Sequence, residues 1–166
     1  MQVLSEPGTA AHFDRIVARE VPGGRGLQAW RALLRAHATL LRQLETDLES
    51  KTGLALADYD VLAQLAIAGG SLRMTNLADR ALISRSGMTR RVARLVHEGL
   101  VRRAHADADA RGVVVQLTSS GLDRLTVTAP VHLRGVSDRF LTKLDEDELA
   151  VLESALAKVT LNCTFG

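Results

Sequence analysis

The chain has 166 residues, of which 46% are hydrophobic and 24% are charged, and its formal net charge is +2. This size and composition are typical of a folded globular protein. No apolar run approaches the roughly 18 residues that a membrane-spanning helix needs, so we expect no membrane partner. Residues 1–11 lack a basic segment followed by an apolar stretch, so we expect no secretion signal and predict a cytoplasmic location.

Positive charge is concentrated in the middle third of the chain. Residues 70–120 contain nine arginines and four acidic residues, which gives this segment a net charge of +5. The planar guanidinium of arginine suits phosphates and guanine edges, so the segment is a candidate nucleic-acid-binding face. Charge alone fits a solvated polar surface equally well.

The N-terminal part of the sequence predicts two helices. A short helix fits residues 12–20 and is expected to end at the loop that contains Pro22. From Leu27 to about Thr52, apolar residues recur at the spacing of an amphipathic helix, and Gly53 supplies a stop. So long a helix, roughly 35–40 Å, leaves apolar surface that a small chain does not cover by itself. This favours a helix bundle or a partner subunit.

The next segment has the spacing of a helix-turn-helix. A short, buried helix is expected after Asp58, closed by Gly69 and Gly70. Another helix is expected to begin near Thr75, a good N-cap residue. Residues 82–84 then form the short connection to a fourth helix, which Ser84 can cap.

The fourth helix, expected to end at His97 or Glu98, has two distinct faces, and we call it the recognition helix. Its predicted packing face consists of Met88, Val92, Leu95 and Val96. Its predicted exposed face consists of Ser86, Arg90, Ala93, Arg94 and His97. One face therefore packs, and the other offers small polar and arginine side chains.

Two strands are expected after the recognition helix, at residues 100–105 and 112–117, joined by residues 106–111. A further helix is expected to start at Thr118 or Ser119, with Pro130 kinking or splitting it. Asp145, with a glutamate three residues later, resembles a capping box that opens a last helix.

These elements predict a mainly α fold with a small β wing, a winged helix-turn-helix flanked by N- and C-terminal dimerisation helices. We predict an N-terminal extension and long dimerisation helix over residues 1–52, a DNA-binding domain over 53–119 and C-terminal dimerisation helices over 120–166.

The order of helices and wing gives specific DNA-contact candidates. Small side chains at the start of the recognition helix allow it to approach base edges in a major groove about 12 Å wide. Its arginines can reach bases or phosphates, with Arg94 placed for the backbone, and Arg111 at the wing can enter a narrow minor groove. The predicted contact residues are Ser84, Arg85, Ser86, Gly87, Thr89, Arg90, Arg91, Arg94 and Arg111.

The sequence resembles the MarR family of transcriptional regulators. The resemblance is carried by residues 82–92 (LISRSGMTRRV), 99–103 (GLVRR) and 109–118 (DARGVVVQLT), and by Gly121. It implies a homodimer that places a recognition helix in each major groove of a pseudo-palindromic operator and a wing arginine in the minor groove. It also implies that Asp109 orients Arg111, for which the alternative is an ordinary turn residue.

The resemblance further implies a small organic effector bound where the long first helix meets the DNA-binding lobe. Trp30, His37, Tyr59 and Asp60 supply the aromatic faces and polar groups that such a site uses, and an aromatic or phenolic compound is the expected class. The alternative is that these four residues serve the core and the helix caps.

No catalytic or metal-binding pattern stands out. The five histidines and the single cysteine, Cys163, show no metal-ligand spacing, and we predict no metal and no cofactor. Oxidant sensing by Cys163 has little support, because no cation lies near it to lower its pKa. The motifs of nucleophilic and phosphate-binding enzymes are missing, so we expect a non-enzyme. The alternative function is a winged-helix docking or dimerisation module that does not bind DNA.

Overall fold

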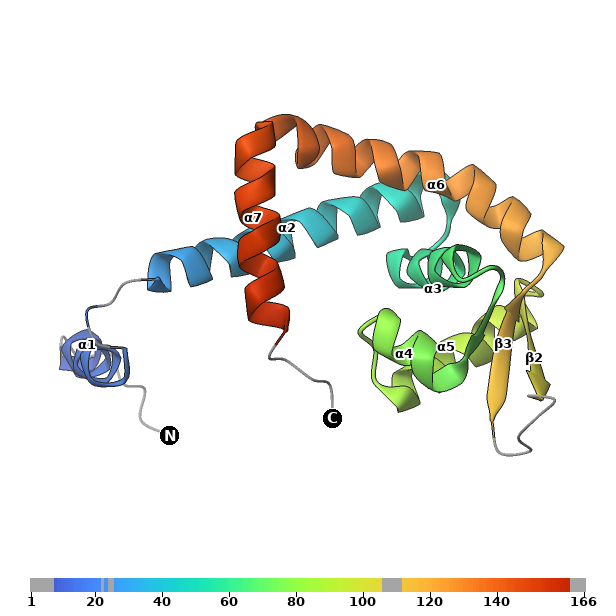
Figure 1. The fold of residues 1–166 in the computed structure, drawn as a ribbon, viewed down its shortest axis with the longest axis horizontal. Helices are drawn as coiled ribbons and strands as arrows, with labels where there is room; N and C mark the ends of the chain where they lie inside the picture. The colour runs from blue at the N-terminus through green and yellow to red at the C-terminus, as the bar shows by residue number, and fades with distance from the viewer. Residues whose placement is uncertain (1–7, 22, 24–25, 106–111, 162–166) are drawn as a thin grey trace. The chain divides into compact units, whose positions relative to one another are not determined.

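The computed structural model describes residues 8–21, 23, 26–105 and 112–161. The chain divides into two compact units, residues 1–41 and 42–166. Figure 1 shows the order of the helices and strands along the chain. The sequence predicts different boundaries, at residues 52/53 and 119/120, which separate functional regions and not compact units. These functional boundaries stay a prediction.

The first unit contains helix α1 (Gly8–Glu20) and the beginning of α2 (Leu27–Thr52). Both helices were predicted, and α1 begins four residues earlier than expected. No residue of α1 is buried. Large apolar side chains are exposed in this unit, namely Phe13, Ile16, Trp30, Leu33, Leu34 and Leu41.

The second unit contains the winged helix-turn-helix. Its helices are α3 (Leu56–Ile67), α4 (Met74–Arg80) and α5 (Arg85–His97), and their apolar faces meet in one core with the end of α2. The fully buried large side chains of this core are Leu48, Leu62, Leu65, Leu77, Met88, Leu95, Val61, Val92, Val101 and Val115. The helix-turn-helix prediction is confirmed.

A three-stranded antiparallel sheet completes this lobe. The strands are β1 (Ser71–Arg73), β2 (Val101–His105) and β3 (Val113–Leu117), in the spatial order β1-β3-β2. The two predicted wing strands are confirmed, and their register runs from Val101↔Leu117 to His105↔Val113. Sequence reasoning missed β1, because three residues are too few to show a period of two.

Two predicted helix starts were displaced. Helix α3 begins at Leu56, so Asp58 lies in its first turn and not before it. Thr75 is not the N-cap of α4, because the helix begins at Met74 and Arg73 occupies the cap position without a side-chain hydrogen bond. The chain enters α4 straight from β1, so the sheet sets the start of this helix.

The C-terminal segment is helical as predicted. Helix α6 (Ser119–Arg139) is followed by the 3₁₀ helix η1 (Leu141–Lys143) and by α7 (Glu146–Thr160). Pro130 lies inside α6 and does not split it, so the expected split is wrong, whereas the alternative kink stays a prediction. The capping box is confirmed, because Asp145 accepts a hydrogen bond from the Glu148 amide and donates its own amide to the Glu148 carboxylate.

Candidate nucleic-acid interface

The position of α5 follows from its buried face. Met88, Val92 and Leu95 are fully buried, and they hold the helix against α3, α4 and the sheet. The opposite face is therefore exposed, as predicted. Val96 was placed on the packing face but is exposed. It lies in the last turn of the helix, so the apolar stripe ends at Leu95.

The start of α5 is shaped by a tight cap. The Ser84 hydroxyl accepts a hydrogen bond from the Gly87 amide at 3.2 Å, which confirms Ser84 as the N-cap. A Cβ at Gly87 would lie 3.0 Å from both Ile83 Cγ2 and Ser84 Oγ. Ser84 and Gly87 therefore shape the helix start, and their contact with DNA stays a prediction.

The four arginines of α5 fall into two pairs. Arg85 and Arg90 are exposed, and their guanidinium groups form no hydrogen bond or ion pair with any residue that the structure describes. Arg91 and Arg94, in contrast, both bind the carboxylate of Asp58. The first pair is available for a ligand, and the second is engaged within the protein.

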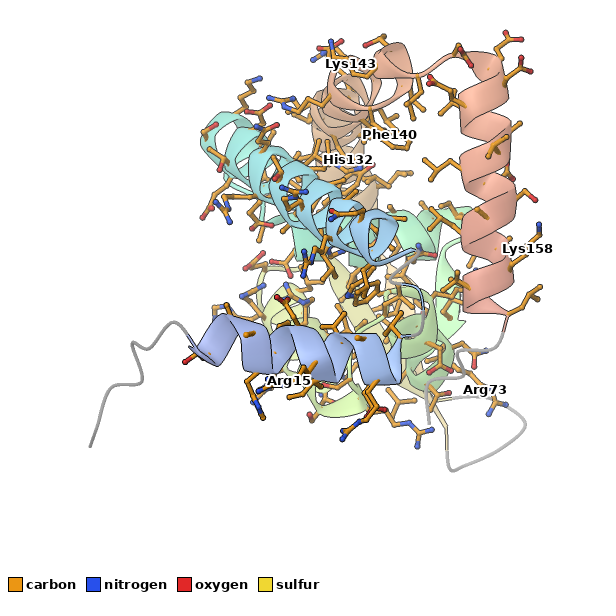
Figure 2. The ribbon with its side chains drawn as sticks, turned by 90° about the vertical axis from the view of Figure 1, so that its left-hand side faces the viewer. Arg15, Arg73, His132, Phe140, Lys143 and Lys158 are labelled. Carbon is orange, nitrogen blue, oxygen red and sulfur yellow. The ribbon has the colours of Figure 1, made fainter. Side chains whose placement is uncertain are left out.

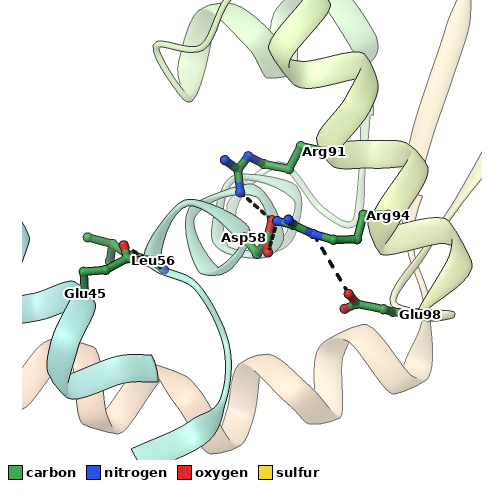
Figure 3. Close-up of polar contacts among 6 residues, drawn as sticks. All are labelled: Glu45, Leu56, Asp58, Arg91, Arg94 and Glu98. Carbon is green, nitrogen blue, oxygen red and sulfur yellow. Dashed lines mark hydrogen bonds and ion pairs between the residues drawn. The ribbon is translucent and has the colours of Figure 1, made fainter. Parts of the chain in front are cut away.

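Asp58 projects from the first turn of α3 toward α5 (Figure 3). Its Oδ1 lies 2.7 Å from Arg91 Nη1, and its Oδ2 pairs with Arg94 Nη2. The hydrogen bond and the negative charge of Asp58 raise the pKa of Arg94. Sequence reasoning did not identify Asp58 as a site residue. The signal available was a carboxylate in the first turn of a mostly apolar helix, 33 and 36 residues before two arginines one turn apart.

The start of α3 also contacts α2. Ala55 at the N-cap position provides no side-chain hydrogen bond. The Glu45 carboxylate of α2 instead accepts a hydrogen bond from the Leu56 amide at 3.2 Å (Figure 3). An acidic group at this helix end is favoured by the partial positive charge of the exposed amides.

A second group of cationic residues lies beside the recognition helix and was missed by sequence reasoning. A cleft of about 390 Å³ is lined by Arg73, Met74, Thr75, Thr89, Arg103, Gly112 and Val113. Arg103 on β2 donates a hydrogen bond to the Thr89 carbonyl at 3.3 Å. Figure 2 labels Arg73, whose side chain is exposed. The run of two arginines at 102–103 was the available signal.

The wing residues Asp109 and Arg111 lie outside the described residues, as does Cys163. The strands on either side of residues 106–111 are paired to their ends, at His105 and Val113. The predicted roles of Asp109 and Arg111 therefore stay predictions.

The four predicted effector residues belong to different units. Trp30 and His37 are exposed on α2 in the first unit, whereas Tyr59 and Asp60 lie on α3 in the second. Tyr59 is buried and lies against His132 of α6, with ring centroids 4.5 Å apart; His132 is labelled in Figure 2.

Asp60 and His132 form a partly buried polar cluster that sequence reasoning did not foresee. Burial raises the pKa of Asp60, although a hydrogen bond from Gln64 and the charge of His132 act in the opposite direction. Burial lowers the pKa of His132, which the charge of Asp60 partly offsets. His132 Nδ1 is buried and has no hydrogen-bond partner among the described residues. A buried acceptor or donor in this state can bind a polar group of a ligand or a water.

The described residues form neither a membrane-spanning helix nor a metal centre. No helix in these ranges is both long and apolar enough to cross a bilayer. No group of three or more histidine, cysteine or acidic side chains in them is arranged to hold a metal ion.

The fold and the exposed arginine-bearing helix define a winged helix-turn-helix protein. The family model described as "MarR family" matches residues 52–112. AbsC, a MarR family transcriptional regulator from Streptomyces coelicolor, is 33% identical with a TM-score of 0.77, over 81% of this chain and 90% of that one. Sco3205, a MarR family regulator from the same organism solved in complex with DNA, is 32% identical with a TM-score of 0.77, over 81% and 88%.

A curated relative agrees with these structures. The HTH-type transcriptional regulator PecS of Dickeya dadantii is 29% identical over 112 residues, which are 66% of this chain and 67% of that protein. The chain belongs to the MarR family of transcriptional regulators.

Proposed function

We propose that the chain regulates transcription by binding double-stranded DNA in a sequence-specific manner, with α5 in the major groove and residues 106–111 at the minor groove. The observation that carries this proposal is the outward face of α5, where Arg85 and Arg90 are exposed and have no partner in the described part of the chain. An exposed helix of this kind fits the major groove, and unpaired arginines suit phosphates and guanine edges.

We assign each residue of this face a role in DNA binding. Arg90 reads a base edge, and Arg85 binds a base or a phosphate. Ser86 and Thr89 are small enough to let the helix approach the bases. Thr89 donates its hydroxyl to the Arg85 carbonyl at 2.9 Å, so its methyl group is the part free to contact a thymine methyl. Arg111 enters the minor groove, oriented by Asp109.

We propose a two-fold homodimer as the binding species. The apolar side chains of the terminal helices support this, because α1 and α7 have no buried residue and α6 exposes Leu122, Val127 and Leu133. A second copy of the chain would cover such surface. Two recognition helices in one dimer call for a pseudo-palindromic operator with half-sites about 10 bp apart. Light scattering at micromolar concentration tests the dimer, and a stable monomer that binds one half-site tightly would contradict it.

We further propose that the protein is a repressor whose operator affinity is lowered by a small aromatic or phenolic effector. The Tyr59 and His132 rings, the Asp60 carboxyl and the unpartnered His132 nitrogen provide suitable groups in the second unit. Trp30 and His37, on the first unit, stay predicted effector residues. Linkage requires that such a ligand weaken DNA binding by the factor by which DNA weakens ligand binding. A thermal-shift screen followed by operator binding tests this, and a ligand that stabilises the protein without altering DNA affinity contradicts it.

The test of DNA binding begins with selection of bound sequences from a random duplex pool. The affinity of the protein for the selected duplex is then titrated against salt. A DNA-binding protein loses affinity steeply as salt rises, because each phosphate contact releases condensed counterions. Arg134→Ala, which removes an exposed arginine of α6, is the control for Arg90→Ala on α5. A protein that enriches no sequence and shows no salt-dependent binding is the docking module of the alternative hypothesis.

A further inference from the structure

Asp58 occupies an unusual position for a carboxylate in this lobe. Its side chain is only 6% exposed, and both of its oxygens face guanidinium groups of the recognition helix. Arg91 and Arg94 are three residues apart, so they lie on one side of α5, one turn from each other. Figure 3 shows the two side chains converging on Asp58 from α5. Half of the arginines of α5 are therefore held by one acidic group.

The two arginines remain partly open to solvent. The side chain of Arg91 is 25% exposed and that of Arg94 is 52% exposed. Without Asp58, Arg91 would keep no acidic partner among the described residues, and Arg94 would keep only the exposed Glu98, whose Oε1 lies 4.0 Å from Arg94 Nε. An exposed pair of this kind is weak, so phosphates become the natural partner of both arginines. Asp58 therefore competes with the DNA backbone for these two groups.

We propose that Asp58 is a positioning residue that withholds Arg91 and Arg94 from DNA phosphates, so that sequence-independent binding is weakened and the contacts of α5 are left to Arg85 and Arg90. This inference rests on the proposed DNA binding. The sequence predicts that Arg91 and Arg94 contact DNA, whereas this inference makes them partners of Asp58 that do not.

The energetic reason lies in the burial of Asp58. If both arginines turned toward phosphates, the carboxylate would stay buried without a counter-charge, which is a costly state. A phosphate at the protein surface is exposed to solvent and screened by salt, so its attraction for an arginine is weaker. The arginines therefore stay on Asp58 when DNA arrives.

Asp58→Asn tests the proposal directly. Asparagine has nearly the same shape, but its amide nitrogen cannot accept a hydrogen bond, so at least one arginine loses its partner. The binding constant of the wild type and of the variant for a mixed-sequence duplex is measured by fluorescence anisotropy at salt concentrations from about 50 to about 200 mM. We expect tighter binding and a plot of log K against log salt that is steeper by about 1 for each released arginine.

Matched variants separate this role from a merely structural one. In the wild-type background, Arg91→Ala and Arg94→Ala should leave the salt slope unchanged, because neither arginine contacts DNA there. In the Asp58→Asn background, the same two substitutions should return the slope to the wild-type value. Asp58→Glu keeps the charge and should stay near the wild type. Simple loss of packing would lower the melting temperature but would not steepen the slope.

The outcomes are distinct. A wild-type protein that shows no salt-dependent binding removes the proposed function and this inference with it. Normal wild-type binding with an unchanged slope in Asp58→Asn removes the inference alone. A slope reduced by about 1 in Arg94→Ala alone also overturns it, because Arg94 would then bind phosphate while paired with Asp58. If Asp58→Asn does not fold, the Arg91→Ala and Arg94→Ala slopes decide the matter.

Discussion

Gly121 in the first turn of α6 lies against the carbonyl oxygen of Leu100, at the entry to β2, within the space that a Cβ would occupy. The same carbonyl accepts hydrogen bonds from the amide and the hydroxyl of Thr118, the N-cap of α6. The start of α6 is thus fixed to the wing at a point where only a residue without a side chain fits.

Gly121→Ala should destabilise the protein. A methyl group there would overlap Leu100 O and approach Leu117 Cδ1 to 2.8 Å, so the helix or the strand must shift. Overpacking against backbone costs more than overpacking against a flexible side chain, and we expect a loss of about 3 kcal/mol in the free energy of unfolding. Chemical denaturation measures it. Gly8→Ala in α1 is the control, because nothing lies within 4 Å of its Cβ position. Equal stability of both variants would contradict the close approach.

Leu82, in the turn between α4 and α5, carries a backbone strain that a substitution can relieve. Its φ is +53°, in the left-handed region, and its side chain is 68% exposed, so little burial compensates the strain. Asparagine tolerates this region better than leucine. Leu82→Asn should raise the free energy of unfolding by about 0.5–1 kcal/mol. Ile67→Asn, at an equally exposed position without positive φ, should give no gain. A loss of stability in Leu82→Asn would show that the leucine packs in a way that outweighs the strain.

Local sequence signals predicted most of this fold. The stripe of Met88, Val92 and Leu95 fixes the outward face of α5, and Ser84 caps its start, because caps and periodicity act within one turn of helix. The wing strands followed from a run of β-branched residues next to a helix stop. Elements whose bounds depend on tertiary contacts were less accurate. The strand β1 exists because Leu72 pairs with Val115, 43 residues later.

The sequence predicted which residues belong to the candidate site better than it predicted which of them contact one another. The sequence singled out all four arginines of α5 but gave no way to know that Asp58 holds two of them, since that contact depends on how α3 packs on α5. The same holds for His132, whose neighbour Tyr59 lies on a helix 73 residues away in sequence. Arg73 and Arg103 meet at one cleft only because the sheet places β1 and β2 on either side of β3.

His132, which lies beside Tyr59, should make the free energy of unfolding depend on pH. Burial lowers the pKa of His132. The unfolded chain therefore takes up this proton at a higher pH than the folded chain does, and the free energy of unfolding should fall as the pH drops below about 6.5. Asp60 acts in the opposite sense, because its pKa is raised by burial and its contribution to stability grows as the pH falls toward that pKa.

Denaturant titrations at about pH 7.5 and about pH 5.5 measure this effect. His132→Phe keeps an aromatic ring beside Tyr59 and removes the titrating group, so its loss of stability at the lower pH should be smaller than that of the wild type. Asp60→Asn should instead increase the loss, because the charge of Asp60 no longer offsets the lowering of the His132 pKa by burial. If His132→Phe retains the full pH dependence of the wild type, another group is responsible for it.

The last prediction concerns how α5 and the wing divide the work on DNA. Arg90 is exposed on the recognition helix, one residue from Arg91, which is engaged by Asp58. A residue that reads a base should matter most on the selected operator. Arg90→Ala should therefore weaken the specific complex by roughly 1–3 kcal/mol and change binding to a mixed-sequence duplex much less. Arg111→Ala should weaken binding to both duplexes without altering the melting temperature, since a minor-groove arginine responds mainly to groove shape and potential.

The measurement is anisotropy on both duplexes at one salt concentration, with Arg134→Ala as the control that should match the wild type. Operator affinity that is unchanged in both Arg90→Ala and Arg111→Ala would rule out recognition by helix and wing, and the cleft of Arg73 and Arg103 would become the next surface to test.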